Sequence, residues 1–358
     1  MSSRLYCLPV HTACRPFGRG TVIAIGRIMF NVTPFASLAE VNQTLSAWGV
    51  EAKAFEQARG GVENTCLIVD TPSHHPRRVV LRIHRPDTDA RLRLELAVLE
   101  HLSRLRLPVP RSLPTARGKG YAMDHGSPAS LLAYVDGVPL DRCTPAPEFA
   151  RAIGVLLARV DLALAEMPDS RDAIAHDITD LASTRDRLAS CRKVAGFPWD
   201  GVETALEDAA RAVSAWPALP RQVIHGDVSR ANIVHDRRRF TLIDFGDAGA
   251  GPRIADVAIA LAQLAIVGGR LRPEIWSGLW AGWAAIANPN DDERNAVLPL
   301  VKLRYAKLIV DHVWRELSAR HHPGHLALVA LGIEGLHALA SAPAGVLSLD
   351  AGSMQGAA

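Results

Sequence analysis

Cysteines are few in this sequence and none of them form a recognisable pair. The 358 residues contain five cysteines: Cys7, Cys14, Cys66, Cys143 and Cys191. They form no C-x-x-C motif, and no histidines stand at zinc-finger spacing. This scatter indicates neither a disulfide framework nor a structural zinc site. Free cysteines suit a reducing compartment, so we expect a cytoplasmic protein.

Long apolar runs are also lacking. The longest one near the amino end, residues 21–25, is followed by Arg27 and is too short for a signal-peptide core or a membrane span. Residues 1–28 contain four arginines and no clear period, and Met29 is a natural start. We expect residues 1–28 to lie outside the packed domain, either as a disordered extension or through an error in the assigned start codon.

An excess of charge of either sign is absent as well. The 40 basic and 37 acidic residues give a formal net charge of +3. This near balance offers no general attraction for nucleic acid or an anionic membrane, so we predict neither as a partner. Hydrophobic residues make up 48% of the chain, which is enough for a packed core.

Strand-like segments are concentrated in the first half of the chain, and helical periodicity dominates the second half. Residues 65–69 and 79–83 have the pattern of a β-hairpin, and 130–135 that of one more strand. The only later strands are expected within residues 223–243. Helical segments are predicted at residues 37–49, 92–105, 147–167, 178–188, 201–215, 256–266, 275–287 and 294–319.

This order predicts an α+β fold with two lobes and a ligand site between them. We expect a small lobe with an antiparallel sheet at residues 29–135 and a larger, mainly helical lobe at 136–345. Residues 346–358 are expected to form a flexible tail.

The segment that says most about chemistry runs from residue 223 to residue 247. Asp227, then Asn232 five residues later, then Asp244 before Phe-Gly are the groups that phosphoryl transfer requires of a kinase-type site. We expect Asp227 to take or orient the proton of an attacking hydroxyl, and Asn232 and Asp244 to bind Mg2+ beside ATP. Oxygen ligands suit this hard cation, and the absence of nearby cysteine disfavours zinc.

These residues resemble the motif of the aminoglycoside phosphotransferase and choline kinase-like superfamily. That motif is His-Gly-Asp, four residues, Asn, and then Asp-Phe or Asp-Trp on a following strand, and residues 225–245 contain all of it. A chance meeting of a turn and a hairpin does not account for the match in residue type, order and spacing. The resemblance covers roughly residues 33–336, and it implies a protein-kinase-like fold, ATP and Mg2+ as cofactors, and a small-molecule hydroxyl as acceptor.

The resemblance places the nucleotide site in the first lobe. Gly60 and Gly61 form a turn whose backbone N–H groups could approach phosphates, although such a turn is also common in simple hairpins. Arg82 stands where related folds carry a phosphate-binding lysine, and Glu95 stands where the partner of that lysine is expected. The alternative for these two residues is a surface ion pair between strand and helix.

Further roles follow from the same resemblance. The backbone of Ala133 and Val135, in the hinge segment, would hydrogen-bond the adenine edge. His225 is expected to pack under the catalytic loop, and Asp256 to brace that loop from the start of a helix.

The acceptor is specified less sharply than the catalytic motif. Motifs in both lobes are most similar to homoserine-kinase-like and hydroxylysine-kinase-like members, which implies a hydroxy amino acid or an amino alcohol. A substrate carboxylate would require Arg304 or Lys302. Candidates for binding a substrate ammonium are Asp161, Asp247, Trp276, Trp280 and Trp283.

Three other functions remain as alternatives. An aminoglycoside-type antibiotic phosphotransferase would need many acidic residues in its site, whereas the helical lobe is rich in basic ones. A catalytically silent kinase-fold binding module is supported only by arginine in place of lysine at Arg82. A metal hydrolase built on His225, Asp227, His235 and Asp244 leaves the features of the first lobe unexplained.

Overall fold

The structure of the chain is a computed structural model. It describes residues 37–58, 64–86, 88–142, 146–167, 180–194, 199–213, 219–318, 323–343 and 345–349, together with residues 175, 178 and 197. The extension expected at residues 1–28, the glycine pair Gly60 and Gly61, and the chain beyond residue 349 lie outside the described residues.

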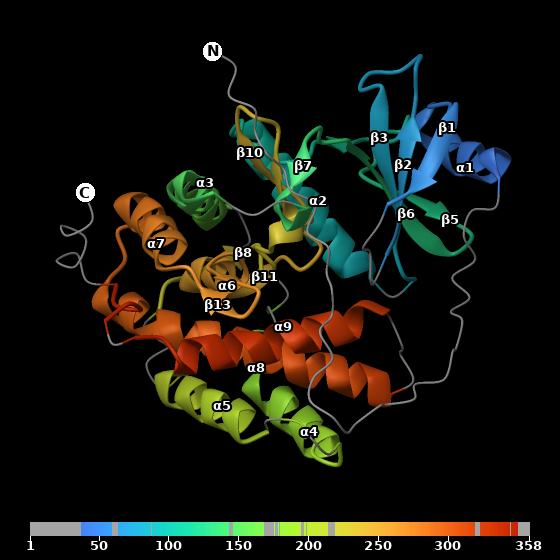
Figure 1. Cartoon of the computed structure of the whole chain (residues 1–358). Coiled ribbons are helices and arrows are strands. Elements are labelled where there is room, and N and C mark those ends of the chain that lie inside the picture. The colour runs from blue at the N-terminus through green and yellow to red at the C-terminus, as the bar shows by residue number, and fades with distance from the viewer. Residues whose placement is uncertain are drawn as a thin grey trace.

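An antiparallel sheet forms the core of the N-terminal lobe (Figure 1). Its strands follow the order β1-β2-β3-β6-β4, and β5 also pairs with β6. The bounds are β1 (Ala54–Gln57), β2 (Thr65–Asp70), β3 (Arg78–Ile83), β4 (Ser112–Leu113), β5 (Ala122–Asp124) and β6 (Ser127–Ala133). Alternate residues of β2 and β3, such as Leu67, Val69, Val79 and Leu81, are buried on one face, which confirms the predicted hairpin.

Two helices complete this lobe. The first is α1 (Leu38–Leu45), which begins with a capping box between Ser37 and Glu40. The chain then makes a 3₁₀ turn and leaves it at Gly49, whose φ of 66° is a conformation that favours glycine. The second helix, α2 (Asp89–Arg104), carries Glu95 on its buried face.

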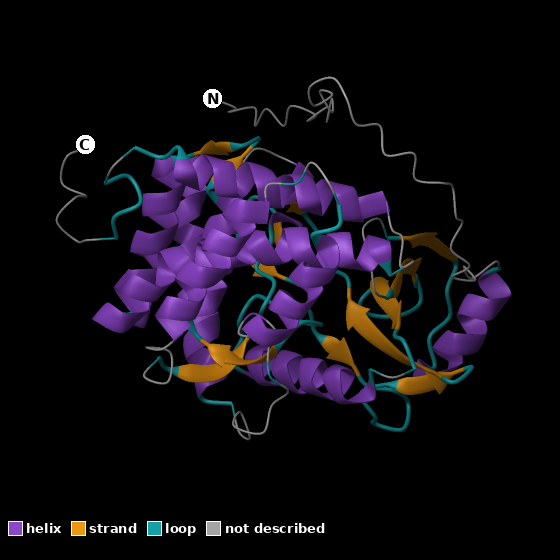
Figure 2. Ribbon diagram, turned by 90° about the horizontal axis from the view of Figure 1, so that it is seen from below, coloured by secondary structure: helices purple, strands orange, loops and turns teal. Residues whose placement is uncertain are grey.

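Helices make up most of the C-terminal lobe (Figure 2). They are α3 (Pro147–Ala165), α4 (Leu181–Cys191), α5 (Trp199–Val213), α6 (Ile254–Leu264), α7 (Pro273–Ala287), α8 (Asp291–Leu317) and α9 (Pro323–Ala340). All eleven residues of α6 are buried, and nine of them are apolar; the exceptions are Asp256 and Gln263. In the described part of the chain, no helix is both long and apolar enough to cross a membrane.

Glycines allow α3 and α7 to pack with their backbones close together. A Cβ atom on Gly154 would lie 2.1 Å from the carbonyl oxygen of Leu279, and one on Gly282 would lie 2.1 Å from that of Arg151. No side chain fits at such a distance, so these two positions require glycine for this helix pair.

Short strands connect the catalytic segment to its surroundings. They are β7 (Val138–Pro139), β8 (Arg221–Ile224), β9 (Ile233–His235), β10 (Phe240–Leu242), β11 (Gly249–Pro252), β12 (Ile266–Val267) and β13 (Arg270–Leu271). The β9–β10 hairpin was expected, but β8 pairs with β11. The expectation that strands end at residue 243 was therefore wrong, because strands this short leave no readable alternation in the sequence.

The helix α9 was also missed. Its glycines weaken the helical signal of the sequence. The structure shows their use: a Cβ on Gly332 would lie 2.6 Å from a side-chain atom of Ile309, and one on Gly335 would lie 2.3 Å from the ring of Tyr305. Contact with α8 therefore overrides the local propensity (Figure 1).

Candidate active site

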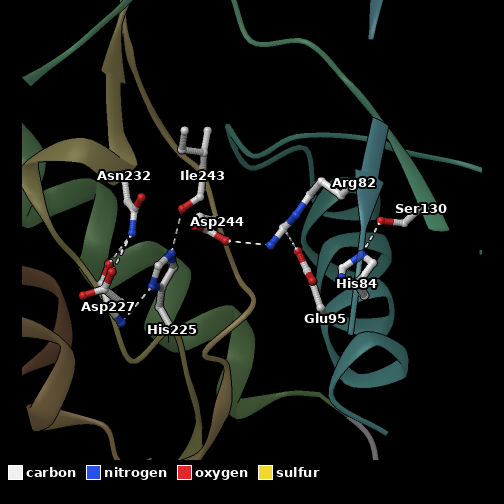
Figure 3. Close-up of polar contacts among 9 residues, drawn as sticks. All are labelled: Arg82, His84, Glu95, Ser130, His225, Asp227, Asn232, Ile243 and Asp244. Carbon is white, nitrogen blue, oxygen red and sulfur yellow. Dashed lines mark hydrogen bonds and ion pairs between the residues drawn. The ribbon is translucent and has the colours of Figure 1, made fainter. Parts of the chain in front are cut away.

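The predicted catalytic loop follows β8 directly. Gly226 has a φ of 81°, which favours glycine at this turn. The side-chain amide of Asn232 donates to both the backbone oxygen and Oδ2 of Asp227, each at 2.9 Å (Figure 3). Asn232 therefore holds the Asp227 carboxylate in place, and its own amide oxygen has no hydrogen-bond partner among the described residues.

His225 lies beneath the loop and joins it to the second half of the motif. Its Nδ1 accepts from the backbone N–H of Asp227 at 3.2 Å, so the proton is on Nε2, which donates to the carbonyl oxygen of Ile243 at 3.0 Å (Figure 3). Its ring also packs against Phe245, with centroids 4.4 Å apart. The fully buried imidazole thus ties Asp227 to the residue preceding Asp244.

Two buried carboxyl groups support the loop from below. Asp256, in the first turn of α6, accepts from the backbone N–H of His225 at 2.6 Å and of Gly226 at 2.8 Å. Asp161 of α3 faces Asp256, and its Oδ2 accepts from the indole N–H of Trp283 at 2.7 Å.

Burial and mutual repulsion make it costly for both carboxyl groups to be ionised at once, so we infer that they share a single proton. Burial, followed by the charge of Asp256, raises the pKa of Asp161 well above its ordinary value. Burial raises the pKa of Asp256 as well, while its two backbone hydrogen bonds oppose that shift. We therefore assign the proton to Asp161, which donates it to the ionised Asp256.

This shared proton predicts a pH dependence of stability. The unfolded chain releases it near the ordinary value of 3.8, whereas the folded chain keeps it to higher pH. The stability that the bound proton gives the folded chain is therefore complete below pH 3.8 and is lost as the pH rises through the raised pKa of Asp161. Over that range the equilibrium constant for unfolding rises by about tenfold per pH unit. In Asp161→Asn the amide donates permanently, so urea unfolding should show this variant gaining stability over the wild type as pH rises.

A matched change at an exposed aspartate of α4, Asp186→Asn, should leave the pH dependence of unfolding as it is in the wild type. Parallel curves of free energy of unfolding against pH for Asp161→Asn and the wild type would contradict the shared proton.

Across from the loop, an ion pair links the two lobes. Arg82 of β3 donates from Nη2 to Oδ1 of Asp244 at 3.1 Å and pairs with Glu95 of α2 (Figure 3). The side chains of Arg82 and Glu95 are 7% and 4% exposed, so the alternative of a surface ion pair was wrong. Burial alone would lower the pKa of Arg82, but the carboxylates of Glu95 and Asp244 raise it.

The backbone around Asp244 is shaped for this contact. Asp244 has a φ of 61°, in the left-handed region that aspartate tolerates better than most residues. At Gly246 a Cβ atom would lie 3.2 Å from Nη2 of Arg82 and 3.4 Å from Oδ1 of Asp244. The Phe-Gly that follows Asp244 therefore leaves room for the arginine.

These side chains fit a nucleotide held with a divalent metal. Asp244 is half exposed, and the amide oxygen of Asn232 has no hydrogen-bond partner in the described part of the chain. Both residues supply the hard oxygen donors that Mg2+ or Ca2+ prefers. Arg82 adds a fixed positive charge on the side of the N-terminal lobe. A nucleotide bound with a metal needs both kinds of group: oxygen ligands for the metal and a positive charge for the phosphates.

The hinge is only partly free to bind a ligand. The N–H of Ala133 donates to the carbonyl oxygen of Arg111 at 2.8 Å, and that of Tyr134 donates to Arg78. The sheet therefore uses the N–H of Ala133, and the expected contact between the hinge backbone and the adenine edge stays a prediction. No partner to the N–H of Val135 is found among the described residues.

The candidate substrate residues fall into two groups. The first group is buried in the interior and consists of Asp161, Trp276, Trp280 and Trp283. The suggestion that these residues bind a substrate ammonium was therefore wrong. Lys302 pairs with Asp208 of α5 at 2.7 Å. Asp247 is exposed on the turn after Gly246, and Arg304 of α8 contacts Asp227, a pairing that no spacing in the sequence reveals.

Comparison with known proteins decides the family. Residues 54–293, more than half of the chain, match the phosphotransferase enzyme family. The chain belongs to this family. This phosphotransferase is thus an ATP-dependent small-molecule kinase with a hydroxyl acceptor.

Individual relatives of the phosphotransferase are distant. It is 27% identical over 229 residues to the homoserine kinase of Methylobacillus flagellatus, covering 63% of this chain and 68% of that protein. It is 25% identical over 285 residues to the homoserine kinase of Polaromonas naphthalenivorans, covering 76% of this chain and 87% of that one.

The solved structures confirm the predicted fold. The amicoumacin kinase hAmiN, in complex with AMP-PNP, Ca2+ and Ami, matches with a TM-score of 0.63 and 13% identity over 85% of this chain and 93% of that one. The two-lobed, protein-kinase-like α+β architecture expected from the sequence is therefore correct.

Proposed function

We propose that this phosphotransferase transfers the γ-phosphoryl group of ATP, with Mg2+, to the hydroxyl group of a small hydroxy amino acid or amino alcohol of the homoserine or 5-hydroxylysine type. The observation that carries the proposal is the placement of Asp227, held by Asn232, on a loop that His225 joins to Asp244. The similarity to homoserine kinases supports the substrate class.

Asp227 is the group that acts on the acceptor. Its carboxylate is 26% exposed, so a hydroxyl group can reach it, and Asn232 holds it in one orientation. We assign it the task of orienting the hydroxyl and accepting its proton. His225 and Asp256 keep the loop in place and do not contact the reacting atoms.

Asn232 and Asp244 would hold the metal through their oxygen atoms. When bound, Mg2+ would neutralise the charge that the phosphate oxygens carry during transfer. Arg82 would contact the phosphates while Glu95 fixes its direction. Because a guanidinium is a planar fork, we expect it to contact two phosphate oxygens where a lysine would offer a single point charge.

The N-terminal lobe, residues 29–135, would bind the nucleotide, and residues 136–345 would supply the catalytic loop and the acceptor site. The carbonyl oxygen of Ala133 and the N–H of Val135 would contact the adenine edge. We also propose that the backbone of Gly60 and Gly61 binds the phosphates.

An antibiotic acceptor is the second candidate. The fold match to an amicoumacin kinase favours it. Against it stands Arg304, whose positive charge lies beside Asp227 and would repel a polycationic drug. A silent binding module is not favoured, because Asp227, Asn232 and Asp244 are all present.

An ADP-release screen tests the proposal. Homoserine and 5-hydroxylysine should release ADP well above the acceptor-free rate, whereas aminoglycosides should not. The Asp227→Ala variant supplies the background for each acceptor. Release with aminoglycosides alone, together with raised drug resistance of an expressing strain, would replace this proposal with the antibiotic function.

A further inference from the structure

A guanidinium group lies directly against the proposed base. Nη2 of Arg304, on α8, pairs with Oδ1 of Asp227, while Asn232 occupies the other oxygen, Oδ2. Asn232 is a proposed metal ligand, so Oδ2 faces the nucleotide side of the carboxylate. Arg304 therefore approaches the oxygen that is left for the acceptor.

Arg304 has more donors than its surroundings use. Its side chain is only 18% exposed, and its buried Nε–H has no hydrogen-bond partner in the part of the chain that is described. Among the described residues, Nη2 is the one nitrogen of the guanidinium that makes a hydrogen bond, although the group carries five N–H donors. Leaving such donors unused inside a protein is costly, so this position favours a further anionic partner.

Neighbouring basic residues of α8 are engaged elsewhere. Lys302 donates to Asp208 at 2.7 Å, and Lys307 donates to Thr184 at 3.0 Å and lies 3.7 Å from Asp311. The contacts with Asp208 of α5 and Thr184 of α4 connect α8 to other helices of the lobe, whereas Asp311 belongs to α8 itself. Arg304 alone of these three contacts the catalytic loop.

Neutralising Asp227 is not a sufficient reason for this arginine. A guanidinium that served only Asp227 would compete with the acceptor hydroxyl for the same oxygen. A ligand that brings its own carboxylate together with a hydroxyl resolves the conflict, because the arginine can share its donors between the two carboxylates.

We propose that Arg304 binds the carboxylate of the acceptor and so selects a hydroxy amino acid over the corresponding amino alcohol. This inference rests on the proposed function and narrows it. Because Arg304 touches Asp227, the hydroxyl and carboxylate groups of the acceptor must be joined by a short chain. The geometry therefore favours the homoserine type over the longer 5-hydroxylysine type.

Two acceptors that differ only in the carboxylate test this assignment: homoserine and 3-aminopropanol. The wild type should have a kcat/KM for homoserine about a hundredfold higher than for 3-aminopropanol, the effect of a hydrogen bond between charged groups. In Arg304→Gln this preference should be lost. The KM for homoserine should rise about a hundredfold, whereas the KM for 3-aminopropanol should change little. Arg304→Lys should recover part of the preference, because it keeps the charge without the fork.

The matched control is Arg294→Gln, an arginine that faces Asp291 and lies ten residues before Arg304 on the same helix, about 15 Å away along its axis. It should keep the wild-type preference. Melting temperature and the affinity for an ATP analogue are measured for each variant, so that a folding defect is recognised.

Other outcomes separate the two proposals. An equal loss of kcat for both acceptors in Arg304→Gln would mean that Arg304 acts on Asp227 or on the transferred phosphoryl group, which overturns the inference. Equal use of both acceptors by the wild type also overturns it but leaves the kinase proposal standing. Use of neither acceptor removes the proposed substrate class, and the assignment of Arg304 with it.

Discussion

Replacing Asp227 with asparagine should reduce kcat by about 10²- to 10⁴-fold, the usual contribution of a positioned general base. The amide has the same shape but cannot accept a proton from the hydroxyl. It also meets the Asn232 amide and Arg304 without the negative charge that both contacts use. Steady-state ADP release with saturating ATP and acceptor measures the effect.

Nucleotide affinity separates this role from metal binding. Asp227 is not a proposed metal ligand, so Asp227→Asn should bind an ATP analogue with nearly wild-type affinity at every Mg2+ concentration. Asp186→Asn, an exposed change on α4, serves as the control and should keep full activity. Wild-type kcat in Asp227→Asn would remove Asp227 from the mechanism.

Replacing Asp244 with alanine should weaken Mg2+-dependent nucleotide binding by about tenfold or more, equivalent to about 1.4 kcal/mol. Its carboxylate is half exposed, and we propose that it binds the metal together with the amide oxygen of Asn232. The change also removes one of the two carboxylates that hold Arg82, which leaves that guanidinium paired with Glu95 alone. Displacement of a fluorescent nucleotide across a Mg2+ titration measures the loss.

The metal-free condition provides the control for Asp244. With the metal chelated, the Asp244→Ala and wild-type proteins should differ much less in nucleotide affinity, since only the change in the contacts of Arg82 then separates them. A Mg2+ dependence identical to that of the wild type would show that Asp244 is not a ligand. Asp227→Asn should therefore lower kcat and leave nucleotide affinity nearly unchanged, whereas Asp244→Ala should lower nucleotide affinity in the presence of Mg2+.

Much of the fold could be predicted because its signals are local. The alternation in β2 and β3, the capping box of α1 and the period of α3 are each contained in a short stretch of sequence. Where the decisive contact is distant, prediction failed: α9 depends on close packing against α8, and β11 pairs with a strand more than twenty residues earlier.

The candidate site divides in the same way. The order and spacing of Asp227, Asn232 and Asp244 belong to one loop and one hairpin, so the sequence by itself determined the reaction class and the family. Whether a carboxyl group such as Asp161 faces a ligand or the interior depends on how helices pack.

Only the tertiary structure decided three things: the burial of Asp161 against Asp256, the use of the Ala133 N–H by the sheet, and the contact of Arg304 with Asp227. Residues 77 positions apart, such as Asp227 and Arg304, have no spacing rule that would bring them together. Their meeting follows from the packing of α8 against the core, which depends on the total buried surface and not on any local motif.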